Sequence, residues 1–526
     1  MNGPPSDRKE PLNRQSETSG SMPHAVRRLT GRVCPANTTA AIIALAGTLL
    51  YALFAFSLLQ NNAYPFFGTD IYDRYFLALT EGRFDLPATV LRYEGHYAPD
   101  GTGYLYHGLA PLITRVLFGW FLPLETVSLA PISIWLWTTV GSLLQHKLFY
   151  NLTVHYWPQG RDRVFWSICL SLMVWITTPG ILLSANTALY HESVAVGYAA
   201  SAGFVYLLAR FHLLGKPLSH ILLPAALVAA VSLHARPNLA IGLFAGVSLL
   251  VILCILKDRL SSLLPCLLAM AVLGASGIGY MAFNAARFGN IGVTHGSFTE
   301  GGVLYGKTFW AGETETNSKR AKAFAEHGRF NAERILPNLA LYAFDPPRPI
   351  FGAALSDKFE KIYRTVTLPV FGFVRLEGPR IGFVFLWLPW LLVPLIAMAA
   401  GGLRSFADGW LLLLATGIAA ALTLSYGTIT LRYRADLWPF FSALAAVSWP
   451  AIAPGFAAFG QSSRRMIAMV VLAISIFFSL GTAIAYQQHF QEVPGSFFAP
   501  WSIEDCRQRA ESRLLDSSNI DRICAP

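Results

Sequence analysis

Two aspartates follow the first long apolar run of the sequence at a spacing of three residues. Asp70 and Asp73 lie in a segment whose aromatic and aliphatic residues recur at helical spacing. This pattern predicts a short amphipathic helix in a membrane interface, with both carboxylates on one face. A partly desolvated carboxylate there could accept the proton of a hydroxyl that attacks carbon. The pair could also hold a divalent cation, or Asp70 could simply cap the helix.

Two histidines lie a little further along, among aromatic residues and glycines. His96 and His107 belong to the stretch RYEGHYAPDGTGYLYHGLAP at 92–111. Aromatic faces with hydrogen-bonding neighbours suit the binding of sugar rings. An aromatic belt at the membrane interface, which needs no ligand, is the alternative explanation.

Cationic and ionisable residues also occur where apolar runs begin or end. Guanidinium groups bind phosphate in bidentate fashion, and snorkelling to the interface is the structural alternative. His191 and Glu192 begin an apolar run, where ionisable groups are costly and therefore candidates for function, although a glutamate there also favours a helix N-terminus. The candidate substrate-binding residues of this kind are Arg236, Arg432, Tyr433, Arg434, His191, Glu192 and Arg287, the last lying in a segment that also predicts a turn.

The amino-acid composition indicates the class of fold that must position these residues. Of 526 residues, 54% are hydrophobic and 13% are charged, whereas soluble domains carry about 25% charged residues. The net charge of +10 comes from scattered Lys and Arg rather than from a basic stripe, so nucleic acid is not an expected partner. We expect an all-α polytopic membrane protein whose partner is the lipid bilayer.

About eleven stretches are long and apolar enough to cross the roughly 30 Å of hydrocarbon in a bilayer. They lie near 39–60, 126–146, 164–184, 192–211, 218–233, 239–256, 260–283, 381–400, 410–425, 437–452 and 466–486.

The distribution of basic residues orients these spans. If Arg27, Arg28 and Arg32 are cytoplasmic, the basic residues of the other short loops fall on the same side, as the positive-inside rule requires. We therefore predict a disordered, basic cytoplasmic segment at 1–32, a membrane domain at 33–486 with external loops at 61–125 and 284–380, and an external tail at 487–526. Cys506 and Cys524 share that tail, where a disulfide would close a loop of about 19 residues and contribute about 3 kcal/mol.

Several short motifs, taken in order, resemble the GT-C class of membrane glycosyltransferases. They are the aspartate-containing loop, Gly-Arg-Phe-x-Leu at 82–86, Tyr-x-Gly-His-Tyr at 93–97, Gly-x-x-Pro at 108–111, FNAARFGN at 283–290 and RYRADLWP at 432–439. Similar segments occur in bacterial members related to the aminoarabinose and protein mannosyl transferases.

The resemblance implies a GT-C-like helix bundle with external juxtamembrane helices. It implies an enzyme, inverting in its stereochemistry, that moves a sugar from a polyprenyl phosphate carrier to a glycan, lipid or protein acceptor on the periplasmic face of a bacterial inner membrane. Asp70 is then the expected base, with Asp73 as the alternative. No cofactor is certain, and a divalent metal ion is left open. A transporter or flippase of lipid-linked glycans and an envelope polysaccharide polymerase or ligase remain rival interpretations.

Overall fold

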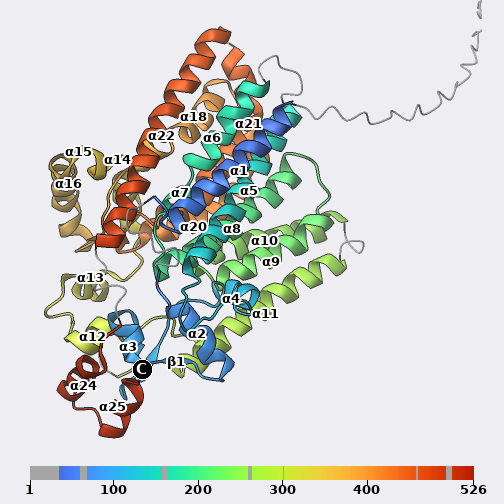
Figure 1. Cartoon of the computed structure of the whole chain (residues 1–526). Helices are drawn as coiled ribbons and strands as arrows, with labels where there is room; N and C mark the ends of the chain where they lie inside the picture. Colours follow the sequence, from blue (N-terminus) through green and yellow to red (C-terminus); the bar gives the residue numbers. More distant parts are fainter. Residues whose placement is uncertain are drawn as a thin grey trace, which may run out of the picture.

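The computed structural model describes residues 35–59, 68–156, 163–258, 263–299, 301–457, 460–492 and 500–525. The predicted disordered segment 1–32 lies outside these residues. The described part of the chain is mostly helical (Figure 1).

Each of the eleven apolar stretches coincides with one helix or with two consecutive helices. Their bounds are α1 (Pro35–Ala55), α5 (Ala130–Tyr156), α6 (Arg163–Ile176), α7 (Pro179–Ser184), α8 (Leu189–His212), α9 (Ser219–Leu233), α10 (Pro237–Asp258), α11 (Leu263–Phe288), α17 (Phe383–Leu386), α18 (Leu388–Ala399), α20 (Trp410–Ser425), α21 (Arg434–Ala457) and α22 (Gln461–Glu492), with the short α19 (Leu403–Asp408) between α18 and α20.

Five of the described helices, α1, α8, α10, α11 and α22, are long and apolar enough to cross a membrane. Four others, α6, α9, α18 and α20, are apolar but shorter. Large apolar side chains such as Ile42 on α1 and Ile278 on α11 are more than 60% exposed, as expected for surfaces in contact with lipid. The structure therefore supports a helical membrane protein, whereas the predicted count of eleven spans is not confirmed.

Helix α8 forms the centre of the bundle and is buried along nearly its whole length. Its many small residues allow neighbouring helices to approach closely, which is how helices associate where lipid removes the hydrophobic driving force. Gly141 of α5 lies so close to Tyr198 of α8 that an added Cβ would be 2.4 Å from the tyrosine ring. This packing holds the middle of α8 closely against α5.

The three long polar segments fold into short elements, many of which gather at one end of the bundle (Figure 1). The first contains the predicted amphipathic helix, α2. The elements are α2 (Ile71–Thr80), β1 (Asp85–Leu86), α3 (Ala88–Leu91), η1 (Arg92–Glu94), β2 (His96–Tyr97), β3 (Gly103–Tyr104) and α4 (Leu112–Phe118); then β4 (Leu304–Tyr305), α12 (Gly306–Ala311), α13 (Lys319–His327), η3 (Ala332–Arg334), α14 (Ile335–Phe344), α15 (Arg348–Phe351), α16 (Ala353–Phe371) and β5 (Arg375–Leu376); and finally α24 (Ile503–Ser512) and α25 (Ser517–Ile523). A further strand, β6 (Thr428–Ile429), lies between α20 and α21.

Two small sheets, which the sequence did not predict, connect the polar segments. One has the antiparallel order β1-β3-β2-β4, so that β4 of the second segment pairs with β2 of the first. His96 lies opposite Tyr104 on one side and Tyr305 on the other. In the other sheet, β5 pairs with β6 in parallel, just before α21. The first sheet thus joins the two polar segments, and the second joins the end of the second segment to the connection between α20 and α21; together they form one wall.

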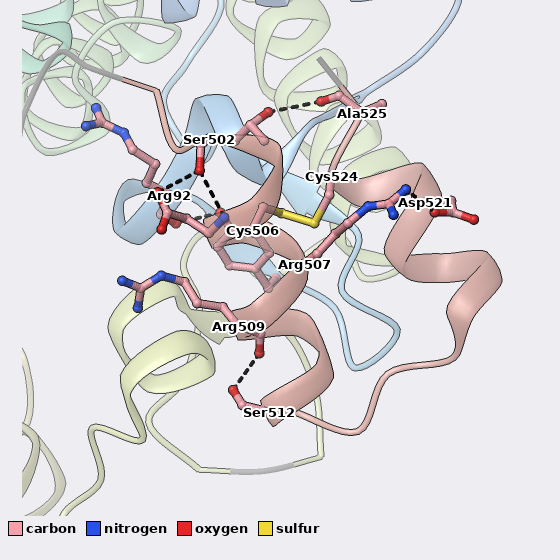
Figure 2. Close-up of a disulfide and its surroundings, with 12 residues drawn as sticks. Arg92, Ser502, Cys506, Arg507, Arg509, Ser512, Asp521, Cys524 and Ala525 are labelled. Carbon is pink, nitrogen blue, oxygen red and sulfur yellow. Dashed lines mark hydrogen bonds and ion pairs between the residues drawn. A yellow bond between two sulfur atoms is a disulfide. The ribbon is translucent and has the colours of Figure 1, made fainter.

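The tail packs on this wall and contains the predicted disulfide. Cys506 and Cys524 are bonded, with their Cα atoms 5.6 Å apart (Figure 2). The Trp501 N–H donates to the carbonyl of Thr89 (3.0 Å), and the Thr89 hydroxyl donates to the carbonyl of Ala525 (3.1 Å). Both ends of the tail are thereby held against α3.

Candidate active site

A cavity of about 400 Å³ lies where the two sheets meet the first turn of α8 and the last turns of α22. Polar segments, helix ends and aromatic side chains all contribute to its lining. The lining residues are Arg92, Tyr93, Glu94, His96, Tyr106, Asn186, Ala188, Tyr190, His191, Phe298, Tyr305, Lys307, Glu313, Arg320, Arg375, Glu377, Gly378, Arg432, Tyr486 and His489. Its volume falls in the range of small-molecule sites.

His96 forms part of the aromatic wall of this cavity. Its ring stacks on Tyr106 at a centroid distance of 4.2 Å, and Tyr305 meets it edge to face at 5.1 Å. The N–H of Gly296 donates to its Nδ1 atom at 2.9 Å. Burial lowers the pKa of His96 well below its usual value, and the nearby His295 lowers it further. The ring is therefore neutral at physiological pH, and its aromatic face borders the cavity.

Glu94 is a carboxylate of the cavity lining that contacts the first turn of α8. It ends the η1 turn, and the hydroxyl of Tyr190 donates a hydrogen bond to its Oε2 atom. Burial raises the pKa of Glu94, while Arg432 and Arg92 oppose that rise. A carboxylate with a raised pKa is a stronger base than an ordinary glutamate.

A second carboxylate, Glu377, lies between two arginines. Its Oε1 atom is 3.1 Å from Nε of Arg375, and its Oε2 atom is 3.0 Å from a terminal nitrogen of Arg432. Burial alone would raise the pKa of Glu377, but Arg432 and Arg375 reverse the shift, so it is lowered. The guanidinium of Arg432 also lies 4.6 Å from the centroid of the Tyr190 ring. One negative charge thus faces two positive ones.

His191 lies at the base of the cavity, as part of a pair with Tyr486. The two side chains are joined through His191 Nε2 and the tyrosine hydroxyl at 2.7 Å. Among the described residues, the buried Nδ1 atom of His191 has no hydrogen-bond partner. Of the residues predicted from sequence, Arg432, His191 and His96 therefore meet in the cavity.

Asp73 and Glu192 do not line the cavity but share one buried arginine behind it. Arg115 donates from Nε to Asp73 at 2.9 Å and with both terminal nitrogens to Glu192, and all three side chains are fully buried. Burial raises the pKa of Asp73, and the attraction of Arg115 opposes the rise. The network ties α2 and α4 to α8, next to Tyr190 and His191. Its geometry is that of a structural connection.

Asp70 lies apart from the cavity lining. It is the residue before α2, its side chain makes no capping hydrogen bond, and its carboxylate instead accepts from Nε of Arg74 at 3.1 Å. The two side chains are 46% and 38% exposed. Asp70 and Asp73 thus do not share one environment, because the first turn of α2 directs only Asp73 into the protein.

The remaining arginines of the late helices have their own partners. Arg236 forms an ion pair with Asp436 and lies 5.1 Å from the centroid of the Tyr433 ring. Arg434 is buried, donates to the carbonyl of Thr430 at 3.3 Å and lies 5.1 Å from the ring centroid of Tyr342. None of Arg236, Tyr433 and Arg434 lines the cavity.

Arg287 and His107 support the wall from behind. Arg287 donates to the carbonyl oxygens of Leu105 (2.6 Å) and His107 (3.1 Å), and to the side chain of Asn284 (2.6 Å). The His107 ring meets Tyr190 edge to face at 5.0 Å. The end of α11 therefore holds the segment after β3 that carries Tyr106.

Sequence reasoning did not single out several cavity residues, and for two of them a signal was present. Glu94 lies immediately before the Gly95-His96-Tyr97 run. Arg375 and Glu377 are two residues apart, and in an extended strand such residues lie on one face, as their ion pair shows. The residues not singled out include Arg92, Glu94, Tyr190, Lys307, Glu313, Arg320, Arg375, Glu377 and Tyr486.

Within the described ranges, no group of three or more His, Cys, Asp or Glu side chains is arranged to hold a metal ion. Asp70 and Asp73, which the sequence allowed as a metal pair, have separate arginine partners.

Comparisons of this chain with models of protein families, with curated proteins and with solved structures found no match.

Proposed function

We propose that this protein is an integral membrane glycosyltransferase of the GT-C type. It takes a sugar from a polyprenyl phosphate carrier and transfers it to a cell-envelope acceptor. The observation that carries the proposal is the cavity in which Glu94 shares one enclosure with the Arg375–Glu377–Arg432 cluster. The aromatic wall of Tyr106 and Tyr305 supplies apolar faces suited to sugar rings.

In this proposal Glu94 replaces Asp70 and Asp73 as the base. The acceptor hydroxyl attacks the anomeric carbon, the bond from that carbon to the phosphate oxygen breaks, and the proton of the hydroxyl passes to Glu94. The bonding electrons leave with polyprenyl phosphate. Because attack and departure occur on opposite faces of the sugar, the reaction inverts the anomeric configuration.

Arg375 and Arg432 hold the phosphate in this scheme. Together with Glu377 they carry one surplus positive charge, which matches the single charge of a phosphodiester donor. The charge on the phosphate oxygen grows as the sugar leaves, so fixed guanidinium groups stabilise the transition state more than the ground state.

The membrane arrangement completes the proposal. The eleven apolar stretches cross a bacterial inner membrane, the N-terminus is cytoplasmic, and the end of the bundle that carries the cavity faces the periplasm. A lipid-linked donor can then reach the cavity from the outer leaflet, and the acceptor can reach it from the periplasm.

One observation favours a second candidate, an envelope polysaccharide ligase. Such an enzyme would use arginines of the large external loop, and Arg320 and Arg375 of that loop both line the cavity. A ligase of this kind takes its glycan from a polyprenyl diphosphate. Whether the protein uses a monophosphate or a diphosphate donor therefore distinguishes the two candidates.

The test uses membranes that contain the full-length protein, with labelled sugars on polyprenyl monophosphate, on polyprenyl diphosphate and on a nucleotide. We expect consumption of the monophosphate donor and a fall of about 10² to 10⁴-fold in Glu94→Gln. Glu81→Gln, an exposed glutamate of the same loop, is the matched control. Consumption of the diphosphate donor alone would favour the ligase, and consumption of neither lipid donor would reject both.

A further inference from the structure

Arg320 lies in the cavity without a carboxylate partner. It belongs to the first turn of α13, and its guanidinium lies within 6 Å of the ring centroids of Phe298, Tyr305 and Phe324. Within the part of the chain that the structure describes, its side chain makes no hydrogen bond or ion pair, and its Nε atom is buried. Arg320 is half-buried, and its buried Nε atom is a donor left without a hydrogen-bond partner among the described residues.

The charged side chains that line the cavity do not balance. The lining has five cationic side chains and three carboxylates, so two positive charges are in surplus. The Arg375–Glu377–Arg432 cluster accounts for one of them. Lys307, Arg320 and Glu313 account for the other, and Glu313 accepts from the hydroxyl of Ser318 at 2.5 Å rather than pairing with Arg320.

Lys307 also lines the cavity, two residues after Tyr305, whose ring lies beside Arg320. It is on α12, directly after β4, and is exposed, with no ion pair among the described residues. An arginine lying over aromatic rings and a lysine in the same cavity lining suit a negatively charged sugar. The aromatic rings would pack on the apolar face of the sugar, and the guanidinium would form paired hydrogen bonds with its anionic group.

We infer that the Arg320–Lys307 side of the cavity is an acceptor subsite that selects an acidic glycan, one that bears a carboxylate or phosphate group on its sugar ring. The inference rests on the proposed function, because it is there that the opposite side of the cavity is assigned to the lipid phosphate. It adds the chemical class of the acceptor.

The test measures binding alone and therefore does not require the donor. Purified full-length protein in detergent is titrated with glucuronate, glucose 6-phosphate and glucose, followed by saturation-transfer NMR. We expect at least one acidic sugar to bind about tenfold more tightly than glucose, the size of effect expected for one charge-assisted contact. The sugar that shows the preference distinguishes a carboxylate ligand from a phosphate ligand.

Three variants make the result specific. Arg320→Gln should abolish the preference, Arg320→Lys should keep part of it, and Lys319→Gln, an exposed neighbouring cation outside the cavity lining, should leave it unchanged. If Arg320→Gln does not fold, Lys307→Gln replaces it and should weaken the preference several-fold, because exposed Lys307 carries little packing.

Equal binding of acidic and neutral sugars by the parent protein would overturn the inference. So would a preference that survives in Arg320→Gln, or in Lys307→Gln when that variant replaces it. If the protein prefers acidic sugars as expected but consumes no lipid-linked donor, the result counts against the proposed function and leaves the subsite in place.

Discussion

The hydroxyl of Tyr190 donates a hydrogen bond to the carboxylate of Glu94. This contact joins the first turn of α8, the most buried of the five helices long enough to cross a membrane, to a three-residue turn in the first polar segment. Arg432 lies over the ring of the same tyrosine. One aromatic side chain therefore touches both the proposed base and the proposed phosphate ligand.

The pH dependence of transfer should reflect this contact. Burial raises the pKa of Glu94, and a base must be deprotonated, so kcat/KM should fall on acidification at a pH above the usual range of glutamate. Tyr190→Phe removes a donor that favours the charged form, so the pKa should rise further and the acidic limb should move to higher pH. Tyr93→Phe, which leaves the Glu94 contact intact, is the control. An acidic limb at the same pH in Tyr190→Phe would contradict the assignment of Glu94.

Asp70→Asn should leave transfer within about twofold of the parent. The carboxylate is almost half exposed and pairs with Arg74 on the surface, and such pairs contribute about 0 to 1 kcal/mol. The measurement is initial transfer rate at saturating donor, with Glu81→Gln treated in parallel. A loss of a hundredfold or more would restore Asp70 as the base and remove Glu94 from that role.

Replacing Arg115 should destabilise the protein strongly. Arg115→Met leaves Asp73 and Glu192 buried without their shared cation, and breaking a buried ion pair costs about 3 to 5 kcal/mol. The SDS fraction at which the purified protein unfolds reports the loss.

Asp73→Asn should be milder, because Arg115 keeps Glu192 and the asparagine oxygen can still accept from it. It therefore separates a structural role from a catalytic one. Normal unfolding with abolished transfer in Asp73→Asn would indicate that Asp73 takes part in the chemistry.

Removing the disulfide should loosen the tail while leaving the bundle intact. Cys506→Ser with Cys524→Ser deletes a cross-link across 18 residues, which in the chain-entropy account is worth about 3 kcal/mol. Hydrogen exchange should accelerate in α24 and α25 and remain slow in α8.

Transfer should also weaken in that double variant. Trp501 packs edge to face on Tyr93 at 5.2 Å, and Arg509 donates to the Tyr93 hydroxyl at 2.9 Å, so the tail supports a cavity residue. Cys169→Ser, a free cysteine within α6, is the control. Unchanged exchange in the tail would show that the disulfide is not what holds it.

The sequence predicted features that depend on local pattern. The apolar stretches became helices, aromatic spacing located α2, and the two tail cysteines paired. Each of these follows from periodicity or from chemistry within some twenty neighbouring residues. The two small sheets were not predicted, because two-residue strands have no periodicity to read.

The partners of the charged residues could not be predicted in the same way. Asp73 pairs with Arg115, 42 residues later, and that arginine pairs with Glu192 after a further 77. Arg236 finds Asp436 at a separation of 200 residues. A single sequence shows which residues could form ion pairs, while helix packing decides which ones do. This is why Asp73 and Arg236 resembled site residues and Glu94 did not.

The pairing of β2 with β4 also has a consequence for biosynthesis. His96 accepts a hydrogen bond from the N–H of Gly296, which lies 200 residues later in the chain. At about 5 to 20 residues per second, the ribosome needs roughly 10 to 40 s to synthesise the residues between them. During that interval α5 to α11 are synthesised while the edge of β2 that later pairs with β4 stays open. An unpaired edge can bind other strands, so a nascent chain that stalls before β4 exposes a strand edge that favours aggregation.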